Sequence, residues 1–86
     1  MHEIIKFSMG KMNLTECCLN KNYVIVNLKL SDESVKNHLR NLGFVVNEKI
    51  KVLHVNFGKS AYLVNVLGVK YAIDKRVACG VIVEDE

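Results

Sequence analysis

The fold is decided by residues 31–51, which read SDESVKNHLRNLGFVVNEKIK. Ser31 or Asp32 can accept backbone N–H bonds at the start of a helix, and Gly43 offers the left-handed residue that ends one. The apolar positions of the helix fall at i, i+4 and i+7, and they are Val35, Leu39 and Leu42. Polar residues fill most other positions, so this spacing predicts a short amphipathic helix that lies on a larger apolar surface.

Length and composition limit the chain to one small domain. Eighty-six residues leave no room for a second core, and an apolar fraction of 50% is enough for one domain to fold unaided. Lys, Asn or Asp interrupts every hydrophobic stretch, so none approaches the roughly 18 apolar residues of a membrane span. The first residues include Glu3 and lack the apolar centre of a secretion signal. We therefore expect a soluble, cytoplasmic protein.

Charge and cysteine usage argue against nucleic-acid binding and against disulfides. The net charge of +3 arises from lysines that are spread singly, and only Lys75 and Arg76 are adjacent basic residues. Such a dispersed pattern is typical of a solvated surface. The three cysteines are an odd number, and the neighbours Cys17 and Cys18 could bond to each other only under strain. Reduced thiols in a reducing compartment are the expected state.

Most of the remaining chain has the pattern of strands and turns. Residues 1–13 are interpreted as an N-terminal leader, and residues 14–19 as one helical turn. Five strands are predicted, at residues 23–30, 49–57, 61–67, 70–74 and 80–83. The apolar alternation changes phase within residues 49–57, which indicates a β-bulge. Asp74 is the expected cap of a single helical turn that reaches Cys79.

These elements predict a mostly β fold. Five short strands joined by tight turns expose fewer edges when they close into a barrel than when they form an open sheet. We therefore expect a small SH3-like five-stranded barrel over residues 14–84, with one inserted helix and a short N-terminal helical turn.

The residues that carry chemistry are scattered along the chain. His38 and His54 have no Asp or Glu close to them in sequence, so no catalytic residue is assigned and the chain is not expected to be an enzyme. Neither Cys-x-x-Cys nor His-x-x-x-His spacing occurs, so no metal ligand and no cofactor is predicted. A soft-metal site built from Cys17, Cys18 and Cys79 stays an alternative to three small core cysteines.

Three stretches, in this order and spacing, resemble a known family. The first is the turn at Leu14 that leads into strand 23–30, and the second is LRNLGF at 39–44, which is similar to Leu-x-x-Leu/Met-Gly-Leu. The third is VNVLGVKYAI at 64–73 followed by ACGVIV at 78–83. The family is FeoA, the small cytoplasmic proteins of bacterial ferrous iron uptake. Val46 and Asn47 stand where that family usually has Pro-Gly.

The resemblance implies an SH3-like barrel without an active site that acts by binding, most of all to the cytoplasmic GTPase domain of the membrane iron transporter FeoB. Nucleic-acid binding and direct membrane insertion are not expected. The alternative it implies is a metal-responsive or metal-carrying domain that binds Fe(II) or another transition metal, as in the C-terminal module of iron-dependent repressors.

If the chain acts by binding a partner, we expect a groove between the helix end and the hairpin that receives an apolar segment of that partner. The candidate partner-binding residues are Phe44, Val45, Phe57 and Tyr62. Each of them could instead belong to the core, an interpretation that is favoured for at least two.

Overall fold

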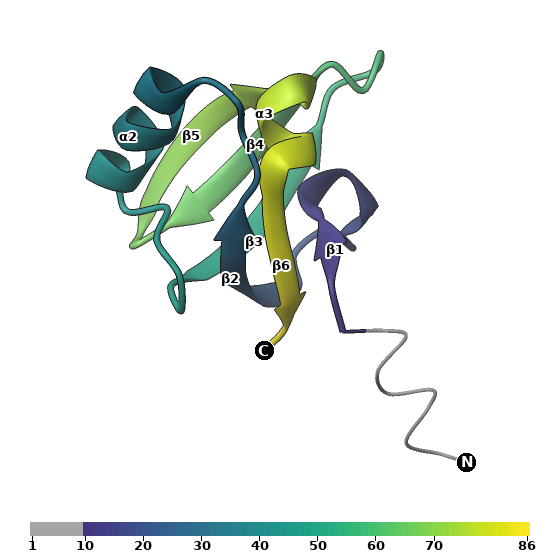
Figure 1. The fold of residues 1–86 in the computed structure, drawn as a ribbon. Coiled ribbons are helices and arrows are strands. Elements are labelled where there is room, and N and C mark those ends of the chain that lie inside the picture. The colour runs from purple at the N-terminus through teal and green to yellow at the C-terminus, as the bar shows by residue number, and fades with distance from the viewer. Residues whose placement is uncertain (1–9) are drawn as a thin grey trace.

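The computed structural model of the protein describes residues 10–86, and residues 1–9 lie outside the described part (Figure 1). Most of the predicted leader therefore falls outside the description. Within it, β1 (Met12–Asn13) pairs antiparallel with the final strand, β6 (Val81–Asp85). In residues 10–86, no helix is long and apolar enough to cross a membrane.

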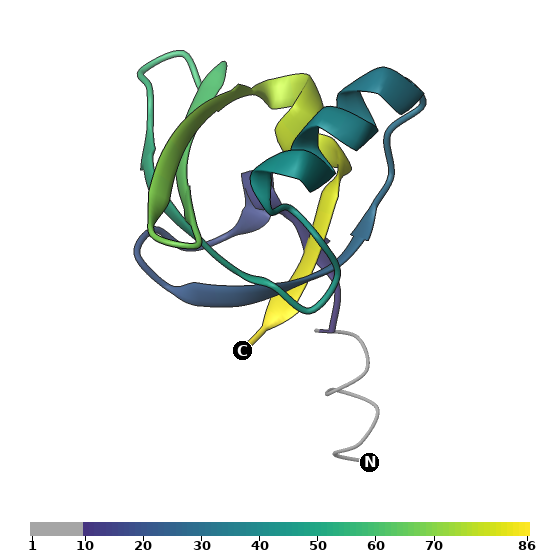
Figure 2. The same ribbon diagram turned by 90° about the vertical axis from the view of Figure 1, so that its left-hand side faces the viewer.

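The described residues form an antiparallel sheet with short helical segments inserted between its strands. Between β1 and β6 the elements follow in the order η1 (a 3-10 helix, Leu14–Glu16), β2 (Asn22–Leu28), α2 (Glu33–Leu42), β3 (Lys49–Val55), β4 (Ala61–Val66), β5 (Val69–Asp74) and α3 (Lys75–Gly80). The six strands are ordered β1-β6-β2-β3-β4-β5. They curl into a ring, and the two α-helices lie on its upper part in the view of Figure 2.

The mostly β fold with one inserted helix and an N-terminal helical turn is confirmed. The five predicted strands correspond to β2–β6, and the two-residue β1 adds a sixth. The side chain of Asp74 accepts a hydrogen bond from Val77 N at 2.9 Å and caps α3, as predicted. Gly80, which was predicted in the last strand, instead ends α3.

Helix α2 begins and ends at the residues that its sequence indicates. The Asp32 carboxylate accepts the backbone N–H groups of Ser34 and Val35, and Gly43 ends the helix with a φ of 110°. Of the predicted apolar face, Leu39 is buried and its two companions are half-buried. The helix therefore lies on the sheet with one apolar side, as its spacing predicts.

Two β-bulges bend the sheet. The register of β3 with β4 shifts between Val52 and His54, which confirms the predicted phase change. A second shift, between Ile25 and Asn27 in β2, was not predicted. Because of it Ile25 and Leu28 both point inward although they are three residues apart. In the sequence, Leu28 alternates in step with Val24 and Val26, which are only half-buried in the structure.

Candidate partner-binding surfaces

The four candidate partner-binding residues divide into two buried and two exposed side chains. Phe44 is 0% exposed and Tyr62 is 3% exposed. Val45 is 39% exposed and Phe57 is fully exposed. Phe44 and Tyr62 are therefore core residues, the interpretation favoured for at least two of the four positions. Whether any of the four contacts a partner stays a prediction.

Phe44 closes the core beneath the end of α2. Its backbone N–H donates to Leu39 O at 3.0 Å, and its ring centroid lies 5.7 Å from that of Tyr71 in β5. The hydroxyl of Tyr71 in turn donates to Leu42 O at 3.3 Å. One aromatic pair thus holds the C-terminal end of α2 against β5.

Exposed apolar side chains occur on the segment that follows α2 and on the β4–β5 hairpin, and the two segments meet at Gly43 and Leu67. Val45 and Val46 follow Gly43 in the chain, and Leu67 lies directly over Gly43, since a Cβ atom built there would be 2.7 Å from Leu67 Cδ1. Val69 begins β5 directly after the β4–β5 turn. We call these residues the α2-end surface, and its members are Val45, Val46, Leu67 and Val69.

Hydrogen bonds to β2 hold the backbone of the segment that follows α2 and carries Val45 and Val46. After α2, Asn47 N donates to Ile25 O and Ile25 N donates to Glu48 O, at 2.8 and 2.9 Å. These bonds attach the segment to β2, and Asn47 adopts a left-handed φ of 77°. Asparagine tolerates this conformation better than most residues, so the turn forms without the Pro-Gly usual in the family.

Leu67 occupies a position that does not suit a leucine. Leu67 and Gly68 are the two central residues of the β4–β5 turn, with φ of 55° and 79°. Such a turn favours Asn-Gly, because a leucine with positive φ brings its Cβ close to the backbone. Leu67 is nevertheless 63% exposed, so burial compensates little for that strain.

A shallow hollow borders Leu67 on its β3 side. It has a volume of about 340 Å³, and its lining includes Leu67, Asn65, Glu48, Lys49 and Lys51. Apolar side chains and charges of both signs therefore meet at its edge. Sequence reasoning missed Val46, Leu67 and Val69, although a leucine before the glycine of a two-residue hairpin turn was a signal for one of them.

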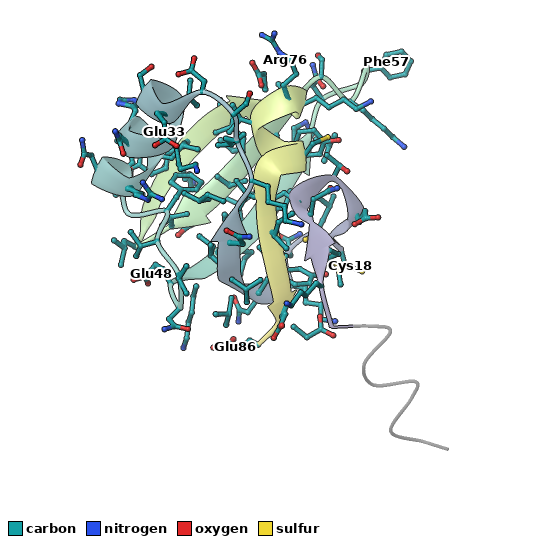
Figure 3. All side chains as sticks on the ribbon, viewed as in Figure 1. Cys18, Glu33, Glu48, Phe57, Arg76 and Glu86 are labelled. Atoms are coloured by element: carbon teal, nitrogen blue, oxygen red, sulfur yellow. The ribbon has the colours of Figure 1, made fainter. Side chains whose placement is uncertain are left out.

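Phe57 lies far from this surface. It is in the turn between β3 and β4, whereas Leu67 is in the turn at the other end of β4. Figure 3 shows the Phe57 ring pointing away from the domain, with Arg76 of α3 at the same end of the molecule. The predicted groove between helix end and hairpin therefore cannot contain Val45 and Phe57 together.

The potential metal ligands do not gather in the described part of the chain. Within residues 10–86, His, Cys, Asp and Glu form no group of three or more that could hold a metal ion. Burial raises the pKa of the Cys17 thiol to about 12, so that thiol is protonated and a poor ligand at neutral pH. Cys18 and Cys79 are exposed, so the interpretation as three core cysteines is wrong for both.

The sequence matches one known family along most of its length. The FeoA domain matches residues 12–85. The chain belongs to the FeoA domain family. This membership supports a role in ferrous iron transport. No curated protein matches the chain.

Solved structures with the same fold include FeoA proteins and a repressor. The FeoA protein of Chlorobium tepidum gives a TM-score of 0.80 at 24% identity, covering 86% of this chain and 70% of that one. The zinc complex of FeoA from Stenotrophomonas maltophilia, described as a prokaryotic SH3 domain protein, gives 0.75 at 26% identity, covering 85% and 89%. A manganese-dependent transcriptional repressor complexed with manganese gives 0.81 at 13% identity, covering 88% and 37%. The predicted SH3-like fold is confirmed.

Proposed function

We propose that this FeoA-family chain is a non-catalytic, cytoplasmic accessory protein of ferrous iron uptake. It binds the cytoplasmic GTPase region of a FeoB-type membrane iron transporter and modulates it. Family membership supports the transport role. The observation that carries the binding role is the exposed, strained Leu67 at the centre of the α2-end surface.

Leu67 supports a binding surface because it has both a strained backbone and an exposed apolar side chain, and burial within the domain compensates little for either. Its backbone has a positive φ, and its side chain leaves most of its area in water. A turn of Asn-Gly would remove both costs. Residues kept in an unfavourable backbone conformation cluster at functional sites, where another interaction requires them. Burial of Leu67 against a partner would supply that interaction.

The surroundings of Leu67 indicate the chemistry of the partner segment. Val45, Val46 and Val69 provide further apolar area. The adjoining hollow is lined by Glu48, Lys49 and Lys51, and Lys49 is paired with Glu86 at 2.8 Å. An apolar segment with one carboxylate beside it would bury its apolar side chains on the valines and place that charge near Lys51. An apolar centre with a polar rim is the usual anatomy of a protein interface.

The decisive experiment measures binding of the Leu67→Asn variant to the purified GTPase domain of the FeoB-type transporter by calorimetric titration. Asparagine suits the turn, so we expect an unchanged or higher Tm together with a Kd that rises roughly tenfold or more. Leu19→Asn is the matched control, since Leu19 is 48% exposed and lies outside the α2-end surface. Wild-type protein that shows no saturable binding, or an L67N variant that binds as tightly as L19N, would contradict the proposal.

A second candidate function is a metal-responsive or metal-carrying domain. Two observations favour it, the zinc complex of the S. maltophilia FeoA and the manganese complex of the repressor. Anaerobic titration of the reduced protein with Fe(II) tests it. Tight one-to-one binding that disappears when Cys17, Cys18 and Cys79 are replaced would favour the carrier, and absence of saturable binding would leave the partner proposal in place.

A further inference from the structure

Phe57 is an aromatic side chain displayed entirely to solvent. Its exposed fraction is 105%, far more than that of the other exposed apolar residues in the described part of the chain. It projects from the hairpin between β3 and β4, at the edge of the molecule (Figure 3). The other residues of that turn are Asn56, Gly58, Lys59 and Ser60, none of which is apolar.

The turn that carries Phe57 is a hydrogen-bonded structure. The side-chain oxygen of Asn56 accepts the backbone N–H groups of Ser60 and Ala61, at 2.8 and 3.0 Å. The Asn56 amide also donates to Ser60 Oγ, and Lys59 N donates to Asn56 O. At the base, Lys75 N donates to Ser60 O at 3.0 Å and links the hairpin to α3. These bonds fix the backbone of the turn that carries Phe57.

The charged residues at this end are mostly cationic. Lys59 lies in the turn itself, and Lys75 and Arg76 begin α3 next to it. All three are exposed. The carboxylate of Asp74 caps α3 through one oxygen and pairs with Arg76 through the other, at 3.7 Å, so it offsets part of the Arg76 charge. Lys59 and Lys75 carry the rest of the positive charge at this end. Asp32 lies farther round the molecule, on the hollow that Asp74 and Arg76 share with α2.

We propose that this end of the domain, Phe57 with Lys59, Lys75 and Arg76, binds reversibly to the surface of an anionic lipid bilayer. Phe57 inserts its ring between the headgroups, and the three cations contact lipid phosphates and carboxylates. The contact is peripheral, so it is compatible with the finding that no described helix spans a membrane. It does not depend on the partner proposed above.

A lipid surface fits this end better than a protein surface does. A protein interface requires a central group of buried apolar side chains surrounded by further contacts. The hairpin tip offers only one apolar side chain, and its surroundings are charged. A lipid interface does not require such a group, since an inserted apolar side chain and each nearby Lys or Arg contribute separately.

Fluorescence of a single inserted tryptophan tests the proposal directly. The chain contains no tryptophan, so in the Phe57→Trp variant all tryptophan emission comes from the hairpin tip. We expect its emission to shift to the blue with phosphatidylcholine vesicles that contain phosphatidylglycerol, and to stay unchanged with phosphatidylcholine alone. Added salt should reverse the shift, because it screens the exposed cations. Leu67→Trp is the matched control and should show no shift.

Co-sedimentation with the same anionic vesicles measures the contribution of the ring. We expect the Phe57→Ala variant to bind roughly tenfold more weakly than the wild type, the loss that follows from leaving an apolar side chain uninserted. Leu19→Ala should bind like the wild type. Emission of F57W that ignores anionic vesicles, or an equal shift in L67W, would overturn the proposal. An F57A variant that loses affinity for the GTPase domain but not for vesicles would assign the tip to a protein partner instead.

Discussion

The two turns that flank β4 expose apolar side chains in different settings. At the β3–β4 turn, Phe57 stands alone among polar residues and close to three cations. At the β4–β5 turn, Leu67 lies over Gly43, and the exposed Val45, Val46 and Val69 are near one or the other of these two residues in the chain. Exposure alone therefore does not identify a function. The neighbours of the exposed side chain decide which kind of surface it can bind.

Each of the two ends contains one phenylalanine. Phe44 is enclosed beneath the α2-end surface, and Phe57 touches almost nothing. Their sequence surroundings, LGFVV and VNFGK, both place an aromatic next to a glycine. The tertiary fold, and not the local sequence, therefore determines that Phe44 is buried and Phe57 is exposed.

The largest expected effect comes from truncating these two side chains. Phe44→Ala should lower the free energy of unfolding by about 3–5 kcal/mol, because it leaves a cavity in the core. Phe57→Ala should change it by less than about 0.5 kcal/mol, because the ring has no contacts to lose. Urea denaturation of both variants measures the difference. Similar losses of unfolding free energy in the two variants would contradict the assignment of Phe44 to the core and of Phe57 to an exposed turn.

A smaller effect is expected where α2 meets the β4–β5 turn. Gly43→Ala should destabilise the protein by about 1–2 kcal/mol, because alanine is strained at a φ of 110° and its Cβ would displace Leu67. The same variant should bind the GTPase domain more weakly, while vesicle binding stays unchanged. Gly58→Ala is the control, since a Cβ there has nothing within 4 Å.

One polar side chain holds each end in place, and the two can be removed separately. Tyr71→Phe deletes the hydrogen bond to Leu42 O, and Asn56→Ala deletes those to Ser60 N and Ala61 N. Each should cost about 0.5–1.5 kcal/mol. N56A should in addition weaken vesicle binding although Phe57 is intact, and Y71F should not. If both variants bound vesicles with equal affinity, the hydrogen-bonded conformation of the β3–β4 turn would not be required for lipid binding.

The smallest expected effect is a dependence of stability on pH at the start of α2. Hydrogen bonds from the Ser34 side chain and from the backbone N–H groups of Val35 and Ser34 lower the pKa of Asp32 below its usual 3.8. The folded-state pKa is depressed, so the contribution of Asp32 is present above the unfolded-state pKa and is lost as pH falls through the folded-state value. Asn keeps the cap without the charge. Denaturation at neutral and acidic pH should therefore show a slightly smaller acid loss for Asp32→Asn than for the wild type.

The sequence was informative wherever a local signal fixes the backbone. The caps of α2 and α3, the phase change in β3 and the hairpin at Gly68 all depend on residues within one turn of each other, and the structure contains each of them. The bulge in β2 gave no such signal. Val24, Val26, Leu28 and Leu30 alternate without a break in the sequence, and only pairing with β6 shows where the extra residue lies.

The candidate site was less predictable because burial is a property of the whole fold. Phe44, Val45, Phe57 and Tyr62 are all apolar residues near turns or strand ends, and no local pattern separates the two core residues from the two exposed ones. The role of Leu67 was equally hidden. Its proximity to Gly43 joins residues from two turns that are more than twenty positions apart.

The length of β4 sets the distance between the two ends of the domain. Six residues at a rise of about 3.3 Å each span about 20 Å, and pairing with β3 and β5 on either side keeps that span constant. A protein held at Leu67 would thus sit at a defined height above a bilayer touched by Phe57, and in a defined orientation. If β3, β4 and β5 were each lengthened by two residues, that height would rise by about 7 Å.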